Sequence, residues 1–462
     1  MSALFTSGEM EAATLGRATR AFEATGISID TRTLKPGDLF VALTGGARDG
    51  HAFVSAAFAA NASSAMVSRR PDDVNDDAPL LTVGHTQRGL EDLGRAARAR
   101  SRAKIVAVTG SAGKTTTKEM LRLACGALGT THASSASYNN HWGVPLSLAL
   151  MPRETQFGIF EIGMNRFGEI RTLNAFVRPH VALITAIAPA HLEFFGSCEA
   201  IADAKSEIFE ALLPGGAALI PADSPYAERL IARAKQVGVS RVLRFGTKPG
   251  SDARLIARSE SEDGMKVEAD ILGRPCHFRI GAAGAHIAAN AVGALLAVAE
   301  LDGDVLNAAA ALSQFAALKG RGQRFAIKAV GGAAEVIDES YNANPSSMAA
   351  AFALLGASKA RRRIAVVGDM LELGSDAAVH HAGLSRDVES ARADLVFACG
   401  PNMKALWEAL PSSRRGAYGL TSTEIADAVT GAIRAGDVVL VKGSFGSRMA
   451  VIVDALKRRA GA

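Results

Sequence analysis

The sequence has 462 residues, of which 48% are hydrophobic and 21% are charged, a length that favours about three folded domains. No apolar run reaches the roughly 18 residues needed to span a bilayer, and no basic segment followed by an apolar one marks a secretory signal, so we expect a cytoplasmic protein. The net charge is +5, but acidic and basic residues alternate without interleaved aromatic residues, which argues against nucleic acid binding.

The four cysteines are Cys125, Cys198, Cys276 and Cys399. They lie far apart and form no CxxC pair, which argues against a zinc site and against a disulfide framework. We therefore expect reduced, buried and chemically inert thiols.

Residues 1–102 predict a small α/β domain. Short apolar segments at 38–43 and 64–67 are separated by Gly-rich turns and Ala-rich helical stretches. The segment 86–104 is polar, Arg-rich and helical in pattern, and it ends directly before an apolar strand. We predict a domain boundary at this point.

Residues 103–317 predict a central domain with a parallel sheet, because apolar strands alternate with helical patterns. Its expected strands lie at 105–109, 157–162, 181–185 and 217–220, followed by β-hairpins over 253–280 and a long helix over 284–300. The alternation restarts after Lys319-Gly320-Arg321-Gly322, which predicts a third, Rossmann-like doubly wound domain over 318–462. Its expected strands lie at 335–338, 364–367, 395–399 and 438–441, and the basic cluster 361–363 is interpreted as a solvated face before a strand.

The turn between strand 105–109 and the following helix predicts a phosphate-binding loop. The loop consists of Gly110, Ser111, Ala112, Gly113, Lys114, Thr115 and Thr116. Backbone N–H groups and the helix N-terminus can surround phosphates there, while the lysine adds a cation and the first threonine a metal-ligating hydroxyl. The spacing is two residues shorter than the pattern GxxxxGK[ST]. An ordinary βα turn is the alternative, and the coincidence of strand, glycines, lysine and paired threonines disfavours it.

Other polar residues leave both functional and structural interpretations open. Glu161 ends a strand at the sheet edge where ligands bind, so it is a candidate Mg²⁺ ligand. His191 also follows a strand and is either a metal ligand or a structural histidine. Lys205 lies in a helical pattern that favours a solvated position. Asn290 and Asp338 are either ligand contacts or a helix-surface residue and a strand-end cap.

Taken in order, these motifs resemble those of the Mur ligase family of ATP-dependent amide-forming enzymes of peptidoglycan synthesis. The likeness covers nearly the whole chain and begins with segments 28–32, 36–43 and 49–53, which resemble the family's domain for the UDP moiety. Segments 139–140, 143–146, 338–345 and 368–374 are most similar to those of members that add D-alanyl-D-alanine to a UDP-N-acetylmuramoyl-tripeptide. Members that add diaminopimelate or lysine usually carry Tyr-Ala-His and Asp-Asn-Pro-Arg, and neither string occurs here.

The resemblance implies ATP and two Mg²⁺ ions as cofactors. It implies that Lys114 contacts the phosphates and that Thr115 and Glu161 are ligands of one Mg²⁺. His191 and a carbamylated Lys205 would be ligands of the second. The two lysines and the histidine are thereby the catalytic candidates. Carbamylation would turn the cationic side chain of Lys205 into an anionic metal ligand. This role conflicts with the solvent-exposed position that the helical pattern favours.

The resemblance also implies contacts with nucleotide and substrates. Asn290 and Asp338 would hold adenine and ribose, and Arg321 would reach the phosphates as the third domain closes. The implied substrate-binding residues are Ser28, Thr31, Arg32, Asn139, Asn140, Asn342 and Asn344. The expected partners are UDP-N-acetylmuramoyl-tripeptide and D-alanyl-D-alanine, and a monomer is expected. The chain departs from the family's usual asparagines at Ala186, Pro221 and Ile287.

Three other functions remain to be distinguished. A folate-type polyglutamate ligase shares the short phosphate loop, but the UDP-like first domain argues against it. A P-loop ATPase switch would hydrolyse ATP without forming an amide. A dinucleotide oxidoreductase would need a GxGxxG after a strand of the third domain, and the sequence has none there. The third residue of the tripeptide, diaminopimelate or lysine, stays open.

Overall fold

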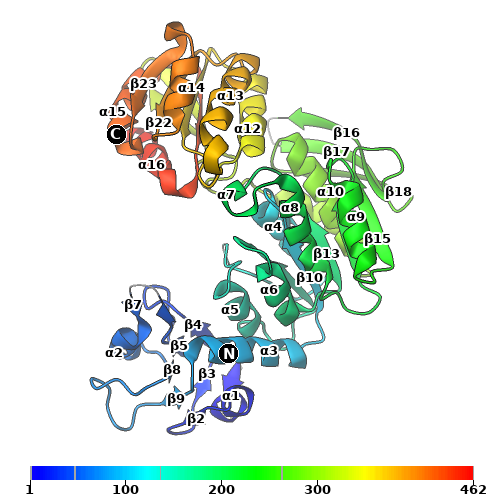
Figure 1. Cartoon of the computed structure of the whole chain (residues 1–462), viewed down its shortest axis with the longest axis vertical. Helices are drawn as coiled ribbons and strands as arrows, with labels where there is room; N and C mark the ends of the chain where they lie inside the picture. Colours follow the sequence, from blue (N-terminus) through cyan, green and yellow to red (C-terminus); the bar gives the residue numbers. More distant parts are fainter. Residues whose placement is uncertain (1–2, 46–47, 136, 262–263, 461–462) are drawn as a thin grey trace.

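The computed structural model describes residues 3–45, 48–135, 137–261 and 264–460. These residues form three α/β units that follow one another along the long axis of the molecule, each built on its own sheet (Figure 1). Among the described residues, no helix is long and apolar enough to cross a membrane.

The N-terminal unit is a small, mostly parallel sheet with helices around it. The strand order is β2 (Arg17–Ala18), β9 (Leu80–Thr82), β8 (Ser64–Val67), β5 (Asp38–Val41) and β4 (Gly26–Ser28), and only β2 pairs antiparallel. Further elements are the pairs β1 (Phe5–Thr6) with β3 (Glu23–Ala24) and β6 (Thr44–Gly45) with β7 (Arg48–Asp49), and the helices α1 (Ser7–Thr14) and α2 (Val54–Ala59).

Helix α3 (Thr86–Arg100) joins this unit to the next one. Its buried leucines, Leu90 and Leu93, pack in the same core as Leu146 of helix α5 (Gly143–Ala149). At its end, the buried Arg98 donates to the backbone carbonyls of Val177 at 2.7 Å and Arg178 at 2.8 Å. The helix predicted over 86–104 therefore ends at Arg100, and it binds the first unit firmly to the second.

The central unit is built on a sheet that is parallel up to β16 and ends in antiparallel hairpins, as predicted. The strand order is β11 (Thr131–Ala133), β12 (Phe157–Glu161), β10 (Lys104–Thr109), β13 (Val181–Ile184), β14 (Ala217–Pro221), β15 (Arg241–Gly246), β16 (Ala253–Ser261), β17 (Gly264–Ile271) and β18 (Arg274–Ile280).

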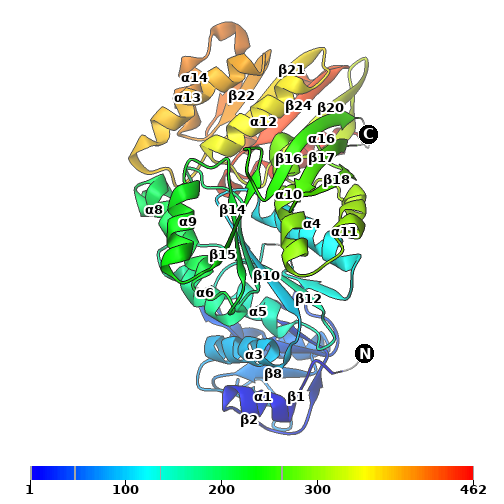
Figure 2. The ribbon, with the colours of Figure 1, turned by 90° about the vertical axis from the view of Figure 1, so that its right-hand side faces the viewer.

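Helices cover both faces of this sheet (Figure 2). One face carries α4 (Lys114–Gly126), α10 (Ala285–Glu300) and α11 (Val305–Ala311); the other carries α5, α6 (Glu169–Val177), α8 (Cys198–Ser206) and α9 (Ala227–Gln236). The parallel strands are therefore buried on both sides, which explains why their sequences are continuous apolar runs. β10, β12, β13 and β14, the hairpin region and the long helix were predicted from the sequence at nearly these bounds, whereas β11 and β15 were not.

The C-terminal unit is a doubly wound sheet. The strand order is β19 (Gln323–Ala329), β20 (Gly332–Glu339), β24 (Asp437–Lys442), β21 (Arg362–Gly368), β22 (Leu395–Cys399) and β23 (Arg415–Gly419), and only β19 pairs antiparallel. Helices α12 (Pro345–Ala357), α13 (Ala377–Ser390) and α14 (Met403–Ala409) cover one face, and α15 (Ser422–Ala432) and α16 (Ala450–Ala460) cover the other.

Three local expectations are corrected by the structure. The strand predicted at 335–338 is not the first of its domain, because β19 precedes it and forms a hairpin with it. Arg362 and Arg363 belong to β21 rather than to a solvated approach, since the buried carboxylate of Asp437 pairs with Arg362 at 2.6 Å. Cys198 is only half-buried, whereas the other three cysteines are buried.

Candidate active site

A cavity of about 1170 Å³ lies between the carboxyl edge of the central sheet and the C-terminal unit. It gathers most of the residues predicted from the sequence: Ser111, Ala112, Gly113, Lys114, Thr115, Thr116, Asn139, Asn140, Glu161, His191, Lys205, Asn290, Arg321, Asn342 and Asn344. Gly110 and Asp338 do not line it, and neither do Ser28, Thr31 and Arg32 of the first unit.

The phosphate loop leads from β10 into α4. Its backbone is left-handed at Gly113, with a φ of 81°, and Gly110 has a φ of 153°. A side chain at Gly110 would collide with the hydroxyl of Thr185, and a Cβ at Gly113 would lie 2.6 Å from Nδ2 of Asn290. Only glycine fits these positions, so the loop can wrap closely around a ligand.

Lys114 begins helix α4 and its ammonium donates to the carbonyl of Gly110 at 2.8 Å. Burial lowers the pKa of Lys114, the neighbouring carboxylate of Glu161 opposes this shift, and Arg321 lowers the pKa further. The hydroxyl of Thr185 donates to the carbonyl of Ala112 at 2.5 Å and holds the loop from the adjacent strand. A cation and a helix N-terminus thus face the same space, which suits phosphate groups.

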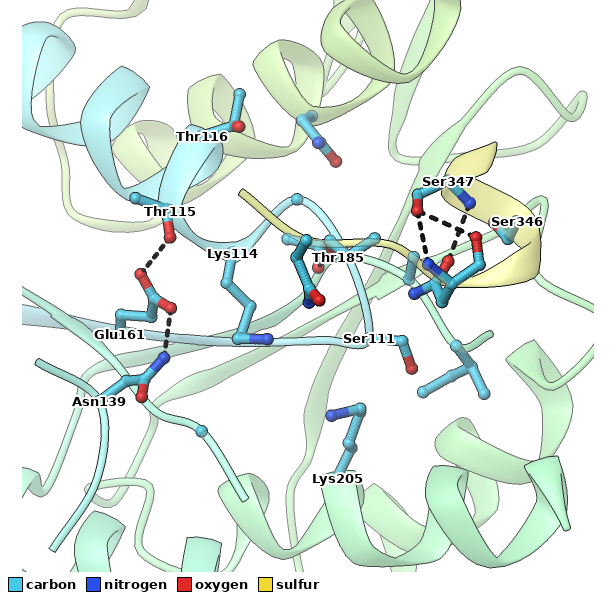
Figure 3. A pocket seen from close by; sticks show the side chains of 18 of the residues that line it. Ser111, Lys114, Thr115, Thr116, Asn139, Glu161, Thr185, Lys205, Ser346 and Ser347 are labelled. Carbon is cyan, nitrogen blue, oxygen red and sulfur yellow. Dashed lines mark hydrogen bonds between the residues drawn. The ribbon is translucent and has the colours of Figure 1, made fainter. Parts of the chain in front are cut away.

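Glu161 accepts hydrogen bonds from two sides at the end of β12 (Figure 3). The hydroxyl of Thr115 donates to one carboxylate oxygen at 2.8 Å, and the amide of Asn139 donates to the other at 2.6 Å. The side chain is 1% exposed. A buried carboxylate beside a hydroxyl is an oxygen set of the kind that binds Mg²⁺, so these residues fit the ion.

Lys205 is buried, and the prediction of a solvated lysine is wrong. It lies on α8 with 1% exposure and extends toward the cavity below Lys114 (Figure 3). Burial, with a further contribution from Lys114, lowers its pKa well below the usual value. The helical pattern could not reveal this, because the side of α8 that carries Lys205 packs against the sheet rather than facing solvent.

His191 precedes the short helix α7 (Leu192–Phe195) with a left-handed backbone, φ 59°. Nδ1 of its imidazole lies against the carboxylate of Glu372 of the C-terminal unit, a contact that becomes an ion pair when the imidazole is protonated. Burial lowers the pKa of His191, and the carboxylate of Glu372 partly opposes the shift. Within the described ranges, no group of three or more His, Cys, Asp or Glu side chains could hold a metal. A second metal at His191 would therefore depend on a modified Lys205.

Asn290 and Asp338 differ in what they offer a nucleotide. Asn290 is buried on α10 but lines the cavity beside Gly113, so it is not a helix-surface residue. Asp338 is 0% exposed and accepts from the backbone N–H of Gly320 at 3.1 Å and from the hydroxyl of Ser340 at 2.5 Å. In this arrangement Asp338 orders the link between the two units and does not face the cavity.

Arg321 stands in that link between two glycines with left-handed backbone, Gly320 at φ 74° and Gly322 at φ 93°. Its guanidinium lies 4.1 Å from the ring centre of Tyr341, and it donates to the hydroxyl of Ser137 at 3.4 Å. The arginine thereby connects the two walls of the cavity.

Three predicted substrate residues, Asn140, Asn342 and Asn344, accept hydrogen bonds from backbone N–H groups. Asn140 accepts from the N–H of Gly143 at 2.9 Å, and Asn344 caps α12 by accepting from the N–H of Ser347 at 2.8 Å. Asn342 accepts from the neighbouring Ala343. These asparagines shape the cavity wall through the loops that they hold.

The predicted UDP contacts lie at the end of β4 and in the loop that follows it. Ser28 donates to the carbonyl of Asp30 at 2.9 Å, and Arg32 pairs with Asp30 at 2.5 Å, which lowers the pKa of that aspartate to about 2. Thr31 follows in the same loop. None of these three side chains lines the cavity.

Sequence reasoning missed several cavity residues. They include Ser137, Thr185 and Tyr341, and Lys442, whose buried ammonium donates to Glu339 at 3.2 Å and to the carbonyl of Asn342 at 2.9 Å. Their partners are distant in the sequence, so no local pattern marks them. The segment 368–374, which contains Glu372, was noted only for its resemblance to the family.

This fold and this cavity define a P-loop protein of three α/β domains. Comparison with known families matches three family models: "Mur ligase family, catalytic domain" over residues 23–98, "Mur ligase middle domain" over 108–298, and "Mur ligase, glutamate ligase domain" over 320–445. The chain belongs to the Mur ligase family, and the resemblance seen in the sequence is confirmed.

Individual relatives are similar over nearly the full length. The UDP-N-acetylmuramoyl-tripeptide--D-alanyl-D-alanine ligase of Rickettsia prowazekii is 32% identical over 93% of this chain and 94% of its own length. The protein of the same name from Escherichia coli is 34% identical over 93% of each chain. A crystal structure of MurF from Acinetobacter baumannii superposes with a TM-score of 0.86 at 30% identity, covering 98% of this chain and 99% of its own. The predicted three-domain α/β fold is confirmed.

Proposed function

We propose that this chain is an ATP-dependent ligase of peptidoglycan synthesis that joins D-alanyl-D-alanine to UDP-N-acetylmuramoyl-tripeptide. The observation that carries the proposal is the cavity in which the phosphate loop, the buried Glu161 and the third domain meet. The full-length relatives named above support the choice of substrates. In this proposal the enzyme acts as a monomer in the cytoplasm.

The proposed domains are 1–102 for the UDP substrate, 103–317 for ATP and 318–462 as the closing, Rossmann-like domain. Ser28, Thr31 and Arg32 would contact the UDP portion. Asn139 and Asn140 would border the peptide, because their loop runs beside Glu161. The predicted ribose contact of Asp338 would require its buried carboxylate to turn outward, so we assign it to the interdomain link instead.

Amide formation from a carboxylate needs an activated acyl group. The terminal carboxylate of the tripeptide attacks the γ-phosphorus of ATP, the bond to the ADP oxygen breaks, and an acyl phosphate forms. The amine of D-alanyl-D-alanine then attacks the acyl carbon, phosphate leaves, and the amine loses a proton. The sum is ATP, acid and amine converted to amide, ADP and phosphate.

The side chains of this cavity would neutralise charge and hold geometry. Lys114 and the backbone of the phosphate loop would bind the phosphates, and Arg321 would approach them from the third domain. Thr115 and Glu161 would hold one Mg²⁺, and His191 with a carbamylated Lys205 the second. When bound, Mg²⁺ supplies charge neutralisation at the transferred phosphoryl group.

Carbamylation is consistent with the chemistry of Lys205. Burial lowers the pKa of Lys205 well below its usual value, which favours the neutral amine. A neutral amine adds CO₂ with loss of one proton to give an anionic carbamate. The buried cations around Lys205, chiefly Lys114, would stabilise that anion. Beside His191 and its neighbour Glu372, the modification would add carbamate oxygens to a set of side chains that is otherwise too small to hold a metal in the described ranges.

The mass of the product tests the proposal directly. The protein is incubated with ATP, Mg²⁺, D-alanyl-D-alanine and UDP-N-acetylmuramoyl-tripeptides that end in diaminopimelate or in lysine. We expect a pentapeptide product and phosphate release that requires both the tripeptide and the dipeptide. Phosphate release without either substrate would favour the ATPase switch, and amide formation on a folate acceptor would favour a polyglutamate ligase.

A further inference from the structure

The loop 162–168 leaves β12 directly after Glu161 and forms one wall of the cavity. It is fixed at both ends and in the middle. The N–H of Gly163 donates to the carbonyl of Asn139 at 2.8 Å, the N–H of Asn165 donates to Glu169 at 2.7 Å, and the N–H of Gly168 donates to the buried Glu207 at 2.8 Å. A loop anchored in this way presents its side chains in a defined position.

Two large, exposed side chains of this loop, Arg166 and Phe167, line the cavity. Phe167 is 56% exposed and rests edge-on against Phe195, with 5.0 Å between the ring centres. Arg166 is exposed, and in the described part of the chain it has no hydrogen bond, ion pair or ring partner. Arg321, the other arginine on the cavity wall, is held by Tyr341 and Ser137. Arg166 therefore offers a free guanidinium to whatever occupies the cavity.

The proposed reaction determines what lies beside this wall. The last residue of the tripeptide carries both the reacting carboxylate and its own side chain on one Cα. If the carboxylate meets a phosphate near Lys114 and Glu161, the side chain must extend along a neighbouring wall, and loop 162–168 begins one residue after Glu161. The two possible third residues share an aliphatic stem and differ at its tip.

Of the two possible side chains, only that of diaminopimelate ends in a group that a guanidinium binds. Diaminopimelate ends in an amino acid group with a carboxylate, whereas lysine ends in an ammonium alone. A guanidinium binds a carboxylate through two parallel hydrogen bonds and repels an ammonium. Phe167 offers an apolar surface to the stem, which both peptides share. Glu169, three residues along, adds an anionic group at the same wall for the amine of diaminopimelate.

We infer that Arg166 is a specificity-determining residue that selects a tripeptide ending in diaminopimelate over one ending in lysine. The inference rests on the proposed ligase function and goes beyond it by naming the third residue and the side chain that recognises it.

The test compares kcat/KM for the two UDP-N-acetylmuramoyl-tripeptides at saturating ATP, Mg²⁺ and D-alanyl-D-alanine. We expect the wild-type protein to favour the diaminopimelate peptide by about 10-fold, the factor that one charge-assisted hydrogen-bonded pair supplies. Arg166→Gln should remove the preference, Arg166→Lys should keep part of it, and Arg166→Glu should reverse it in favour of lysine. A purely structural role would lower both activities and could not reverse their ratio.

Control variants distinguish recognition of the end of the third side chain from a general loss of peptide binding or of activity. Phe167→Ala should lower kcat/KM for both tripeptides by similar factors. Arg386→Gln removes an exposed arginine of α13 outside the cavity and should change neither value. Thermal unfolding of each variant checks that the fold is retained.

The possible failures are distinguishable. If the wild-type protein forms no product with either tripeptide, the proposed function fails. If it uses both equally well, or favours lysine, the function stands and the selection by Arg166 is overturned. A raised KM for D-alanyl-D-alanine with both tripeptides in Arg166→Gln would assign the guanidinium to the carboxylate of the dipeptide and would also overturn the inference.

Discussion

The carboxylate of Glu372 in the third domain lies against Nδ1 of the His191 imidazole in the central domain. Beside it, the N–H of Glu193 donates to the carbonyl of Glu372 at 3.2 Å. Glu372 has a left-handed backbone with a φ of 62°, which is unfavourable for a residue with a side chain. The strained backbone and the two contacts indicate that this point of the third domain is shaped to meet the central one.

Removing the Glu372 side chain should loosen this meeting point. For Glu372→Ala we expect a larger radius of gyration in the nucleotide-free protein, and kcat and KM that change together, as hinge-linked variants do. Small-angle scattering with and without ATP and substrates measures the first effect. Glu372→Gln, which keeps the size of the side chain, serves as the control for lost volume. Identical scattering of wild type and Glu372→Ala in all states would rule out the contact as a closing element.

Glu161→Gln should abolish most of the activity without unfolding the protein. The amide keeps the volume and can still bond to Thr115 or Asn139, but it removes the negative charge that would hold Mg²⁺. We expect product formation to fall by at least about 100-fold. The melting temperature should change little, and Glu228→Gln on the surface of α9 should be neutral. A variant with the wild-type rate would remove Glu161 from the metal site.

Lys205 should make the stability depend on pH in a defined direction. Its pKa in the folded protein lies well below the unfolded value of about 10.4. Between these two values the unfolded chain binds more protons, so the unfolding free energy contributed by Lys205 rises with pH. Lys205→Met should reduce that slope by up to about 1.4 kcal/mol per pH unit.

Urea unfolding at several pH values between about 7 and 9, in buffer without bicarbonate or metals, measures this slope. Lys359→Met, at an exposed lysine, is the control and should leave it unchanged. An equal slope in wild type and Lys205→Met would show that the lysine titrates normally. In ¹³C-bicarbonate, the carbamate carbon should give an NMR signal in the wild type that is absent from Lys205→Met.

Gly113→Ala should weaken nucleotide binding. The left-handed backbone costs about 1–2 kcal/mol with a side chain, and the new Cβ would lie 2.6 Å from Nδ2 of Asn290. We expect the Kd for ATP to rise at least about 10-fold, as measured by titration calorimetry. Gly126→Ala, at the end of the helix that Gly113 precedes, is the matched control, because its Cβ meets nothing within 4 Å. Unchanged affinity in Gly113→Ala would contradict a tightly fitted loop.

The fold was predictable where local pattern and packing agree. The parallel strands of the central domain are continuous apolar runs because helices cover both faces, and the phosphate loop joins a strand to a helix within a few residues. β19 escaped prediction because it is an edge strand, with alternating exposed and buried positions at a domain junction. Arg362 belongs to a strand only because Asp437, distant in sequence, neutralises it.

The site was predictable where its residues follow strand ends, as Glu161 does. The helical pattern wrongly predicted that Lys205 is exposed to solvent. Such a pattern shows which residues share one face of a helix, but it does not show whether another element covers that face. Asp338 was correctly placed at a strand end, yet its partners in the domain link decide where its carboxylate lies. Lys442 contacts Glu339 on the neighbouring strand of its sheet, and Tyr341 contacts Arg321 and Phe445. These partners are distant in the chain, so no short window of sequence contains them.

The position of Arg321 between Gly320 and Gly322 bears on the order of events in a catalytic cycle. In a rotation about these two glycines, a residue at the pivot travels a short arc, while residues farther from the pivot travel a longer one. The third domain can therefore swing away to admit a dipeptide while its arginine stays near the phosphate loop. A nucleotide would remain held during that exchange, so the acceptor can arrive without the loss of the activated donor.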